Sequence, residues 1–303
     1  MAQPRASVII PTRGRDACVR QTLRDLSMQQ YREFDIWVVD QNDAALVGLE
    51  NETGGIFLHH ERMAPLGSHA GRNHAIFKTA AEICIFVDDD VRLDSRFVGA
   101  HVEIYQQSSI SVASIAGRVI QPCDGFTEEQ MRKMGQPARY NRWLGRVSGN
   151  FVGSQSAAVD HIHECNFSAK TSALREIGGF NEEFQGNAYF EGADLALRLI
   201  KAGYQVVYRP EILLTHLQEG AGGNRVNDKA SHTYWFMRNY GLLNSLHMHQ
   251  ISLPIFAVYG VAYVIAKAAK NVNSKIAISG LKGLGAGLRY FLPGAIRLRS
   301  RRS

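Results

Sequence analysis

One apolar run that ends in three carboxylates constrains this chain more than any other stretch. Residues 83–87 (Ile-Cys-Ile-Phe-Val) have no polar alternation, and Asp88, Asp89 and Asp90 follow at once. Such a run predicts a strand that is buried on both faces of a parallel sheet. Ligands of open α/β sheets bind beyond the carboxyl ends of the strands. The carboxylates are therefore predicted to form a ligand site, or else a solvated acidic turn that ends the strand.

The chemistry of this triplet favours a cation. Adjacent carboxylates repel one another unless a cation or hydrogen bonds offset their charges. Asp88 and Asp90 are two residues apart, so in an extended chain they project to the same side. Their hard oxygen atoms suit Mg2+ or Mn2+ shared with a diphosphate. The triplet thus predicts a divalent cation site.

Strand-like and helix-like segments alternate in the first third of the chain. Strands are predicted at 7–10, 34–39 and 56–59, and helices after the first strand and over 69–81. This alternation predicts a doubly wound, parallel sheet whose strands end at one edge. That edge would carry Thr12, Arg13, Asp40 and Asn42 beside the acidic triplet, and its expected guest is a nucleoside diphosphate with a metal. The first strand is followed neither by Gly-x-Gly-x-x-Gly nor by a P-loop motif.

Composition places the chain among ordinary globular proteins. Of 303 residues, 45% are hydrophobic and 20% charged, which predicts one large domain, or one domain with an appendage. The four cysteines (Cys18, Cys84, Cys123 and Cys165) are scattered, so reduced thiols in a cytosolic protein are expected. The sequence begins with Met-Ala-Gln-Pro-Arg and runs directly into a strand-like segment, which predicts that no signal peptide is present.

Several blocks resemble those of family 2 glycosyltransferases, which have the GT-A fold. In the first half they are Ser7–Arg13, Val38–Asp43, Gly71–Asn73 and Phe86–Asp90. In the second half they are Cys165–Lys170, Gly178–Phe184, Tyr189–Leu199 and Ala202–Tyr204. Each block alone is weak, but the ordered set over about residues 5–240 is specific. The resemblance implies a Rossmann-like, mostly parallel sheet flanked by helices.

The resemblance also implies roles for individual residues. Asp90 would be the principal metal ligand of a DxD-type motif, with Asp88 facing the metal or the ribose. His216 would add a metal or diphosphate contact, although a lone histidine at a strand end is more commonly a partly buried structural residue. The nucleotide-sugar would be bound by residues from the other blocks: Pro11, Thr12, Arg13, Asp40, Asn42, Arg72, Asp88, Asp89, Asn166 and Arg225.

Two carboxylates are candidates for the catalytic base. A helix is predicted over 191–201, closed by Gly203, and it would place Glu191, Asp194 and Arg198 on one face. Where the family usually has two adjacent acids, of which the second is generally the base, this chain has Glu191 and then Gly192. Glu191 is predicted to serve, with Asp194 as the alternative. Both acids could instead be structural, because a helix N-terminus favours negative charge.

The end of the chain differs in charge from its beginning. Residues 225–303 carry a net charge of +11, whereas residues 1–224 carry −5. Residues 253–266 hold no charged residue, but about 20 apolar residues are needed to cross a bilayer. This segment is expected to be a buried, interfacial or re-entrant helix. With the basic residues nearby it predicts binding to an anionic membrane surface rather than to nucleic acid.

These observations combine into one prediction. Residues 1–225 form a GT-A domain, with a nucleotide-binding half (about 1–118) and an acceptor half (about 119–225), and residues 226–303 form a helical, membrane-associating extension. The protein is predicted to be a Mg2+- or Mn2+-dependent, inverting glycosyltransferase, peripheral on the cytoplasmic face of the membrane. It would transfer a sugar to a glycan or lipid-linked hydroxyl in cell-surface polysaccharide synthesis. Alternatives are a sugar-phosphate nucleotidyltransferase and a nucleotide-sugar-binding protein without efficient transfer.

Overall fold

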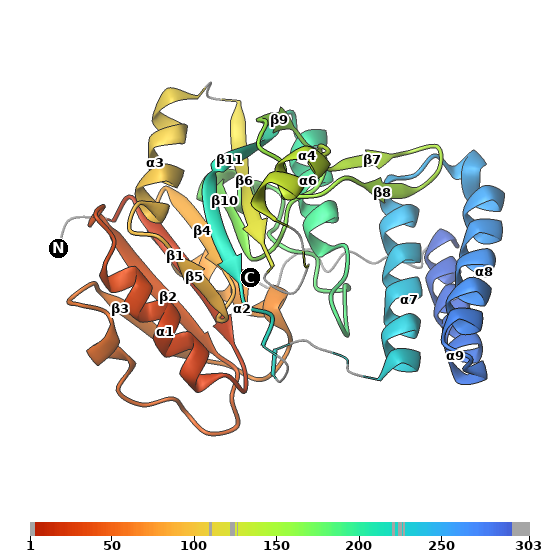
Figure 1. Cartoon of the computed structure of the whole chain (residues 1–303), viewed down its shortest axis with the longest axis horizontal. Coiled ribbons are helices and arrows are strands. Elements are labelled where there is room, and N and C mark those ends of the chain that lie inside the picture. Colours follow the sequence, from red (N-terminus) through yellow and green to blue (C-terminus); the bar gives the residue numbers. More distant parts are fainter. Residues whose placement is uncertain are drawn as a thin grey trace.

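The computed structural model describes residues 4–108, 111–121, 125, 127–219, 222–223, 226 and 228–292. Its centre is a nine-stranded sheet in the order β3-β2-β1-β4-β10-β6-β11-β5, with β9 paired to β11 beside this path. Helices cover both faces of the sheet, and three further helices stand together at one side of the molecule (Figure 1). The protein is thus mixed α/β with a C-terminal helical region, which confirms the predicted fold class.

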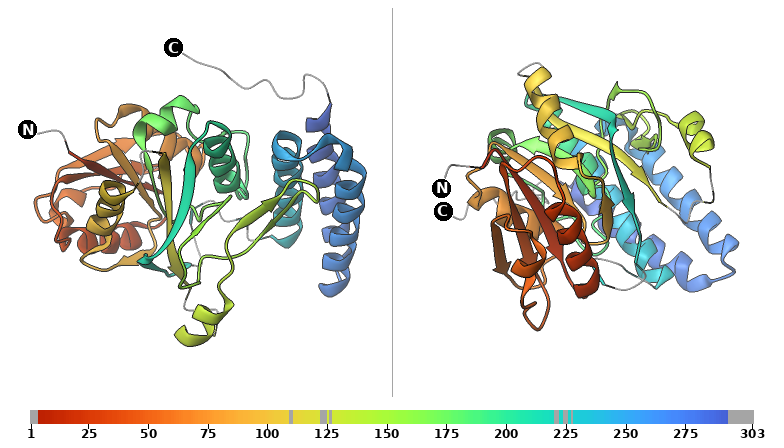
Figure 2. Two further views of the ribbon diagram at one scale, coloured as in Figure 1. Left: turned by 90° about the horizontal axis from the view of Figure 1, so that it is seen from above. Right: turned by 60° about the vertical axis from the view of Figure 1, so that its left-hand side comes forward.

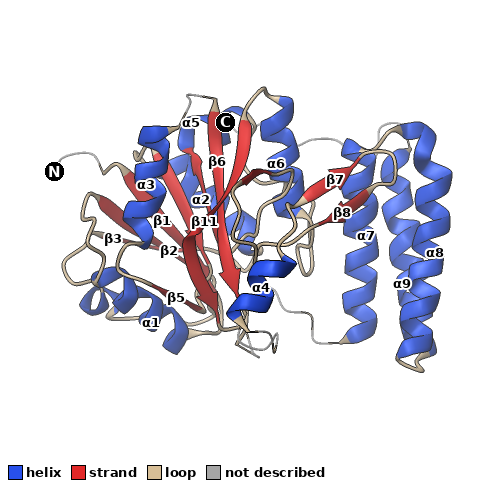
Figure 3. Ribbon diagram, turned by 45° about the horizontal axis from the view of Figure 1, so that its top comes forward, coloured by secondary structure: helices blue, strands red, loops and turns tan. Residues whose placement is uncertain are grey.

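The first half of the sheet is parallel. It consists of β1 (Ala6–Thr12), β2 (Phe34–Asp40), β3 (Leu58–Arg62) and β4 (Ile83–Val87). β1 pairs with β2 and β4, and β2 with β3. The connections through α1 (Asp16–Ser27) and α2 (Ser68–Lys78) run in opposite directions across the sheet, so right-handed crossovers place these helices on opposite faces (Figure 3). The carboxyl ends of these strands therefore share one edge, as the sequence predicts.

Several predicted boundaries differ from the observed ones, and two of the differences have a clear local cause. The third strand begins at Leu58, the first residue to pair with β2, rather than at residue 56. Helix α2 ends at Lys78 rather than at residue 81, because Thr79 has an extended conformation (ψ 145°). The Thr79 hydroxyl accepts a hydrogen bond from the backbone N–H of Ala81, which stabilises the turn into β4.

The second half of the sheet mixes strand directions. It contains β5 (Val91–Leu93), β6 (Val112–Ile120), β10 (Asn166–Lys170) and β11 (Gln205–His216). β10 runs antiparallel to both β4 and β6, and β11 runs parallel to β6. Consequently β4, β6 and β11 point the same way, and the start of β10 lies beside their ends. One edge therefore holds the residues after β4, the end of β11 and the residues before β10.

The sheet part of the chain contains further short strands and helices. They are η1 (Leu49–Glu52), α3 (Phe97–Gln107), α4 (Glu128–Met134), β7 (Arg139–Asn141), β8 (Arg146–Ser148), β9 (Ala157–Ala158), α5 (Thr171–Glu176) and α6 (Glu191–Lys201). Helix α6 has the predicted bounds, and Gly203 follows it in the left-handed conformation (φ 93°). Cys18, Cys84 and Cys165 are free thiols, and Cys123 lies outside the described residues.

The C-terminal helices pack on the acceptor half. They are α7 (Lys229–His247), α8 (Leu253–Lys270) and α9 (Ser274–Leu288), with short 3-10 turns η3 (Gln250–Ser252) and η4 (Arg289–Phe291). An apolar cluster joins them to Phe184, to Tyr140 of β7 and to Leu197 of α6. The hairpin β7–β8 reaches toward these helices (Figure 2). The predicted domain boundary near residue 225 falls between β11 and α7, and it stays a prediction.

Helix α8 is longer than its uncharged core suggests. Together with η3 it forms a helical stretch, Gln250–Lys270, that is long and apolar enough to cross a membrane by length and composition, and 28% of its most apolar window is buried. Its inner face packs Phe256, Gly260, Val264 and Ala268 against the other helices. Its outer face exposes apolar side chains, among them Ile251, Val258 and Ile265.

Candidate active site

A cavity of about 570 Å3 lies at the shared edge of the sheet. Its size is in the range of small-ligand sites. It is lined by the ends of β1 and β4, the start of α2, the segment before β10 and the start of α6. The predicted site residues that line it are Pro11, Thr12, Arg13, Arg72, Asp88, Asp89, Glu191 and His216. The fold thus brings together residues that are far apart in the sequence.

Other predicted residues do not line the cavity. Asp40, Asn42, Asp90, Asn166 and Asp194 are not among its lining residues, and Arg225 lies outside the described residues. Asp40 accepts hydrogen bonds from the backbone N–H groups of Asn42 and Leu46 and contacts His60 Nε2 at 3.1 Å. Asn166 donates to the backbone carbonyl groups of Arg118 and Ile212. These side chains stabilise the strand ends from inside.

Asp88, Asp90 and His216 form a compact ligand set. One ligand atom from each lies within 4.8 Å of the others. His216 Nε2 is 3.2 Å from Asp90 Oδ1 and 3.9 Å from Asp88 Oδ2. The set forms because β4 and β11 run in the same direction and end at the same edge. Two carboxylates and an imidazole suit Mn2+ or Mg2+, so the residues present fit the implied cation.

A second group shares His216. His163, Cys165 and His216 also bring one ligand atom each within 4.8 Å. The sequence around His163 shows no typical spacing of metal ligands. The fold nevertheless brings His216, at the end of β11, close to His163. Burial lowers the pKa of His163 to about 4. A neutral imidazole can donate a nitrogen lone pair to a cation, whereas a protonated imidazole would repel it.

Asp90 and Asp89 are both buried, yet their electrostatics differ. Burial alone would raise the pKa of Asp90, but the hydrogen bond and charge of His216, together with Arg15, outweigh it, and the net shift is downward. Asp90 Oδ2 also accepts the backbone N–H of Glu219 at 2.9 Å. For Asp89, burial dominates and raises the pKa to about 6, although Arg15 and Thr12 oppose the shift.

Arg15 is a site residue that the sequence analysis missed. Its Nη1 lies 2.9 Å from Asp89 Oδ1 and 3.1 Å from Asp90 Oδ2. Its Nη2 donates to the backbone carbonyl group of Glu219, which lies beyond β11. Arg15 therefore joins the acidic triplet to the chain after His216. Its position directly before α1 was the available signal, because the first turn after β1 faces the same edge.

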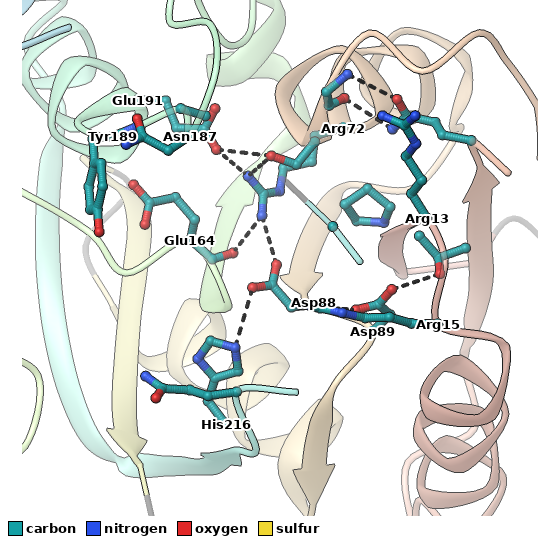
Figure 4. A pocket seen from close by; sticks show the side chains of 18 of the residues that line it. Arg13, Arg15, Arg72, Asp88, Asp89, Glu164, Asn187, Tyr189, Glu191 and His216 are labelled. Carbon is teal, nitrogen blue, oxygen red and sulfur yellow. Dashed lines mark hydrogen bonds and ion pairs between the residues drawn. The ribbon is translucent and has the colours of Figure 1, made fainter. Parts of the chain in front are cut away.

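Arg72 links the metal side of the cavity to helix α6. It is 2% exposed, and its guanidinium contacts Glu191 Oε1 at 2.5 Å and Asp88 Oδ1 at 2.9 Å (Figure 4). Glu191 Oε2 is 3.3 Å from His69 Nδ1. Both carboxylate oxygens of Glu191 are therefore close to basic groups. This geometry suits a residue that orients Arg72.

Asp194 faces away from the cavity. Its carboxylate pairs with Arg198 Nε at 2.7 Å and with His247 Nε2 at 2.8 Å. Burial alone would raise its pKa, but Arg198 and His247 reverse the shift and lower it. These contacts join α6 to α7, and they match the structural alternative that the sequence analysis kept open for this acid.

Comparison with known proteins identifies the family. The model of Glycosyl transferase family 2 matches residues 7–167, more than half of the chain. The chain therefore belongs to glycosyltransferase family 2, which favours the glycosyltransferase over the nucleotidyltransferase alternative. The matched region contains the ends of β1 and β4, the buried Arg72 and the segment before β10.

Curated relatives are distant. A GalNAc(5)-diNAcBac-PP-undecaprenol beta-1,3-glucosyltransferase of Campylobacter jejuni is 23% identical over 61% of this chain. A pre-mycofactocin glycosyltransferase of Mycobacterium tuberculosis is 24% identical over 69% of this chain. The chain spans 57% and 42% of the lengths of these two relatives.

Solved structures confirm the GT-A type of fold. S. aureus TarS 1-349 in complex with UDP-GlcNAc matches 96% of this chain and 82% of its own, with a TM-score of 0.64 and 14% identity. The mannosyltransferase PcManGT from Pyrobaculum calidifontis, in complex with GDP-Man and Mn2+, matches 96% of this chain and 88% of its own, with a TM-score of 0.54 and 15% identity.

Proposed function

We propose that the protein transfers a sugar from a nucleoside-diphosphate sugar to a hydroxyl of a glycan or lipid-linked acceptor, with Mg2+ or Mn2+ and with inversion at the anomeric carbon. The observation that carries this proposal is the set of Asp88, Asp90 and His216 beside Arg72, at the edge where strands β1, β4 and β11 end. Cation ligands and a buried guanidinium in one cavity match the charge of a diphosphate.

The donor is expected to bind with its diphosphate toward this edge. Asp88, Asp90 and His216 would hold the cation, which would offset the charge that develops on the leaving diphosphate. Arg72 and Arg13 supply positive charge from the cavity wall. Ser68 begins α2, whose N-terminal backbone N–H groups and dipole favour an anion. Asp40, Asn42 and Asn166 are proposed to act through the strand ends that they stabilise.

Transfer with inversion needs one general base. The acceptor hydroxyl is a weak nucleophile, so a carboxylate should remove its proton as the oxygen attacks. Glu191 is the candidate that the sequence indicates, and its contacts with Arg72 and His69 give it an orienting role as well. Asp194 has both oxygens engaged by Arg198 and His247, so we propose a structural role for it.

A lipid-linked acceptor and a membrane surface are supported by the outer face of α8. Val258 is 72% and Ile265 57% exposed, whereas Lys267 and Lys270 stand in the last turn of the helix. Exposed apolar side chains beside basic ones fit an anionic membrane surface. The Campylobacter jejuni relative is named for a substrate linked to undecaprenol through a diphosphate. We propose that this chain works as a peripheral protein on the cytoplasmic leaflet, in cell-surface polysaccharide synthesis.

A donor panel tests the proposal. The protein is incubated with UDP-glucose, UDP-N-acetylglucosamine or GDP-mannose, with Mn2+ or EDTA, and with water or a polyprenyl-diphosphate-linked N-acetylhexosamine as acceptor. Release of a nucleoside diphosphate that depends on the cation, with a β-linked product from an α-linked donor by NMR, is expected. Release of pyrophosphate, or no turnover of any donor, would contradict the proposal.

A further inference from the structure

Glu164 stands apart from the other acids of the cavity. Among the lining acids in the described part of the chain, Asp88 and Glu191 each pair with Arg72, and Asp89 pairs with Arg15. The carboxylate of Glu164 makes no ion pair within 4.0 Å with a described cation. Its Oε1 accepts the backbone N–H of Gly192 at 2.9 Å. Glu164 is therefore the lining acid whose carboxylate is free of a salt bridge and able to take a proton.

The sheet topology brings Glu164 to the reacting edge. Glu164 precedes β10, which runs antiparallel to β4 and β6. The start of β10 consequently lies beside the carboxyl ends of its neighbours, where the metal ligands are. Nη2 of Arg72 donates both to Asp88 and to the backbone carbonyl group of Glu164. A single guanidinium thus ties the cation side of the cavity to the segment that carries Glu164.

Gly192 makes room for the Glu164 carboxylate. A Cβ atom on Gly192 would lie 2.5 Å from Glu164 Oε1 and 2.8 Å from the backbone carbonyl oxygen of Ile162. The glycine at the second position of α6 therefore lets the carboxylate dock on the helix N-terminus. The side chain of Glu164 occupies the space that a side chain at position 192 would need.

The segment of the cavity wall beside Glu164, residues 187–190, has an unusual backbone conformation. Ala188 (φ 53°) and Phe190 (φ 74°) are non-glycine residues in the left-handed region, where backbone strain is commonly associated with functional sites. They flank Tyr189, which lines the cavity together with Asn187. In Figure 4 the Glu164 carboxylate lies between Tyr189 and Glu191. A phenol and an amide beside a carboxylate are suitable contacts for an acceptor hydroxyl.

The surroundings of Glu164 favour its protonated form. Burial raises the pKa of Glu164 above its usual range, and the negative charge of Glu191 adds to the shift, while Arg72 and the Gly192 N–H oppose it. The groups that face it are Glu191 from α6, Arg72 from α2 and Tyr189 from the wall. A general base is most effective when its pKa is close to the working pH.

We infer that Glu164, rather than Glu191, is the catalytic base of the proposed transfer reaction. The inference rests on the proposed function. The Glu164 carboxylate takes the proton of the acceptor hydroxyl while the hydroxyl oxygen forms a bond to the anomeric carbon. The bond from that carbon to the diphosphate oxygen breaks, and its electron pair leaves with the nucleoside diphosphate. Glu191 then acts as a positioning residue that holds Arg72.

The test compares Glu164→Gln with Glu191→Gln. Glutamine keeps an oxygen for the N–H of Gly192, so the local fold is preserved. With a donor from the panel and Mn2+, water or the acceptor serves as nucleophile and nucleoside diphosphate release is measured. Glu164→Gln should lower kcat by about 10²- to 10⁴-fold, the usual contribution of a general base. Binding of UDP or GDP with Mn2+, measured by calorimetry, should stay within about threefold of wild type, given the typical scatter between variants.

The pH profile separates the two glutamates. Wild-type kcat should rise with pH to a plateau, because the base must be ionised to accept a proton. This acidic limb should vanish in Glu164→Gln. In Glu191→Gln it should persist with a lower plateau and move to lower pH, because the Glu191 charge that raises the pKa of Glu164 is removed. Glu103→Gln, an exposed change on α3, is the matched control.

Each outcome decides between the explanations. Turnover of Glu164→Gln close to wild type, or loss of nucleotide binding in that variant, would overturn the assignment. Loss of the acidic limb in Glu191→Gln alone would return the role to Glu191. If wild type turns over no donor, the proposed function itself fails and the inference fails with it, whereas a failure of the inference alone leaves wild-type turnover intact.

Discussion

The ligand edge of the sheet and the C-terminal helices are built in opposite ways. At the sheet edge, charged groups are buried: Arg72, Asp89 and Asp90 are each at most 3% exposed. On α8, apolar groups are exposed, with Val258 at 72% and Ile265 at 57%. Buried charges need partners, which Arg15, His216 and the facing carboxylates supply here. Large exposed apolar patches usually mark a binding surface. This difference supports the proposal of two ligands of opposite character, a charged nucleotide at the sheet edge and a lipid surface at α8.

The two regions also differ in how their cores are packed. The sheet is filled by apolar strands such as Val8–Ile10 and Ile85–Val87. The helices α7 and α9 instead approach through glycines, since a Cβ atom on Gly283 would collide with the backbone of Tyr234, and one on Gly241 with Gly287. Close helix contacts through small residues are typical of helix packing that does not depend on the hydrophobic effect.

The largest effect is expected from a substitution in the charged region at the sheet edge. Asp90→Asn removes a charged ligand that also faces Arg15 and His216, so cation-dependent nucleoside diphosphate release should fall by at least about 10³-fold, in line with losses of electrostatic stabilisation in active sites. Release is measured with Mn2+ and the best donor. Asp94→Asn, an exposed change that keeps an acceptor for the Arg96 N–H, is the control. Equal loss in both variants would argue against a specific role for Asp90.

A smaller effect is expected on the exposed apolar face. Val258→Glu should weaken binding to vesicles that contain anionic phospholipid by about tenfold, because full burial of a valine contributes about 1.5 kcal/mol. Co-sedimentation with such vesicles measures it. Val47→Glu is a matched control, since Val47 is 75% exposed but lies on the sheet body. If Val258→Glu binds the vesicles as well as wild type does, or if wild type does not bind them, the proposed membrane role of α8 is wrong.

The smallest effect concerns helix packing. Gly283→Ala should lower the free energy of unfolding by about 1 kcal/mol, because overpacking outweighs the gain in helix propensity. Gly285→Ala on the same helix meets no atom within 4 Å and should be neutral or stabilising by up to about 1 kcal/mol. Denaturant unfolding measures both. Equal stability of the two variants would contradict close packing between α7 and α9.

The sheet edge was largely predictable because its signal is local. Apolar runs such as 83–87 predict buried parallel strands, and parallel strands bring Thr12, Asp88 and Asp89 to one edge. The position of His216 follows only when β11 is known to run parallel to β4. The antiparallel insertion of β10 carries no comparable signal in the sequence, so Glu164 could not be assigned to the cavity.

The helical region was less predictable. The sequence predicts α8 from the uncharged run at 253–266, but not that one face is buried against α9 while the other stays exposed. Which face of the helix is buried depends on the elements that pack against it in the fold. The contact of Arg15 with the acidic triplet is similar, because it depends on how the turn after β1 is oriented rather than on any motif.

The most direct test of the central claim is a thermal shift with nucleoside diphosphates. UDP and GDP are added to wild-type protein with Mn2+, with Mg2+ or with EDTA. Ligand at 100 times its Kd stabilises the folded state by about 2.7 kcal/mol, which corresponds to an increase in Tm of roughly 4 °C for a chain of this size. We expect this increase with at least one nucleotide when a cation is present and its loss in EDTA. The same increase in EDTA, or none under any condition, would contradict a cation-dependent nucleotide site at the sheet edge.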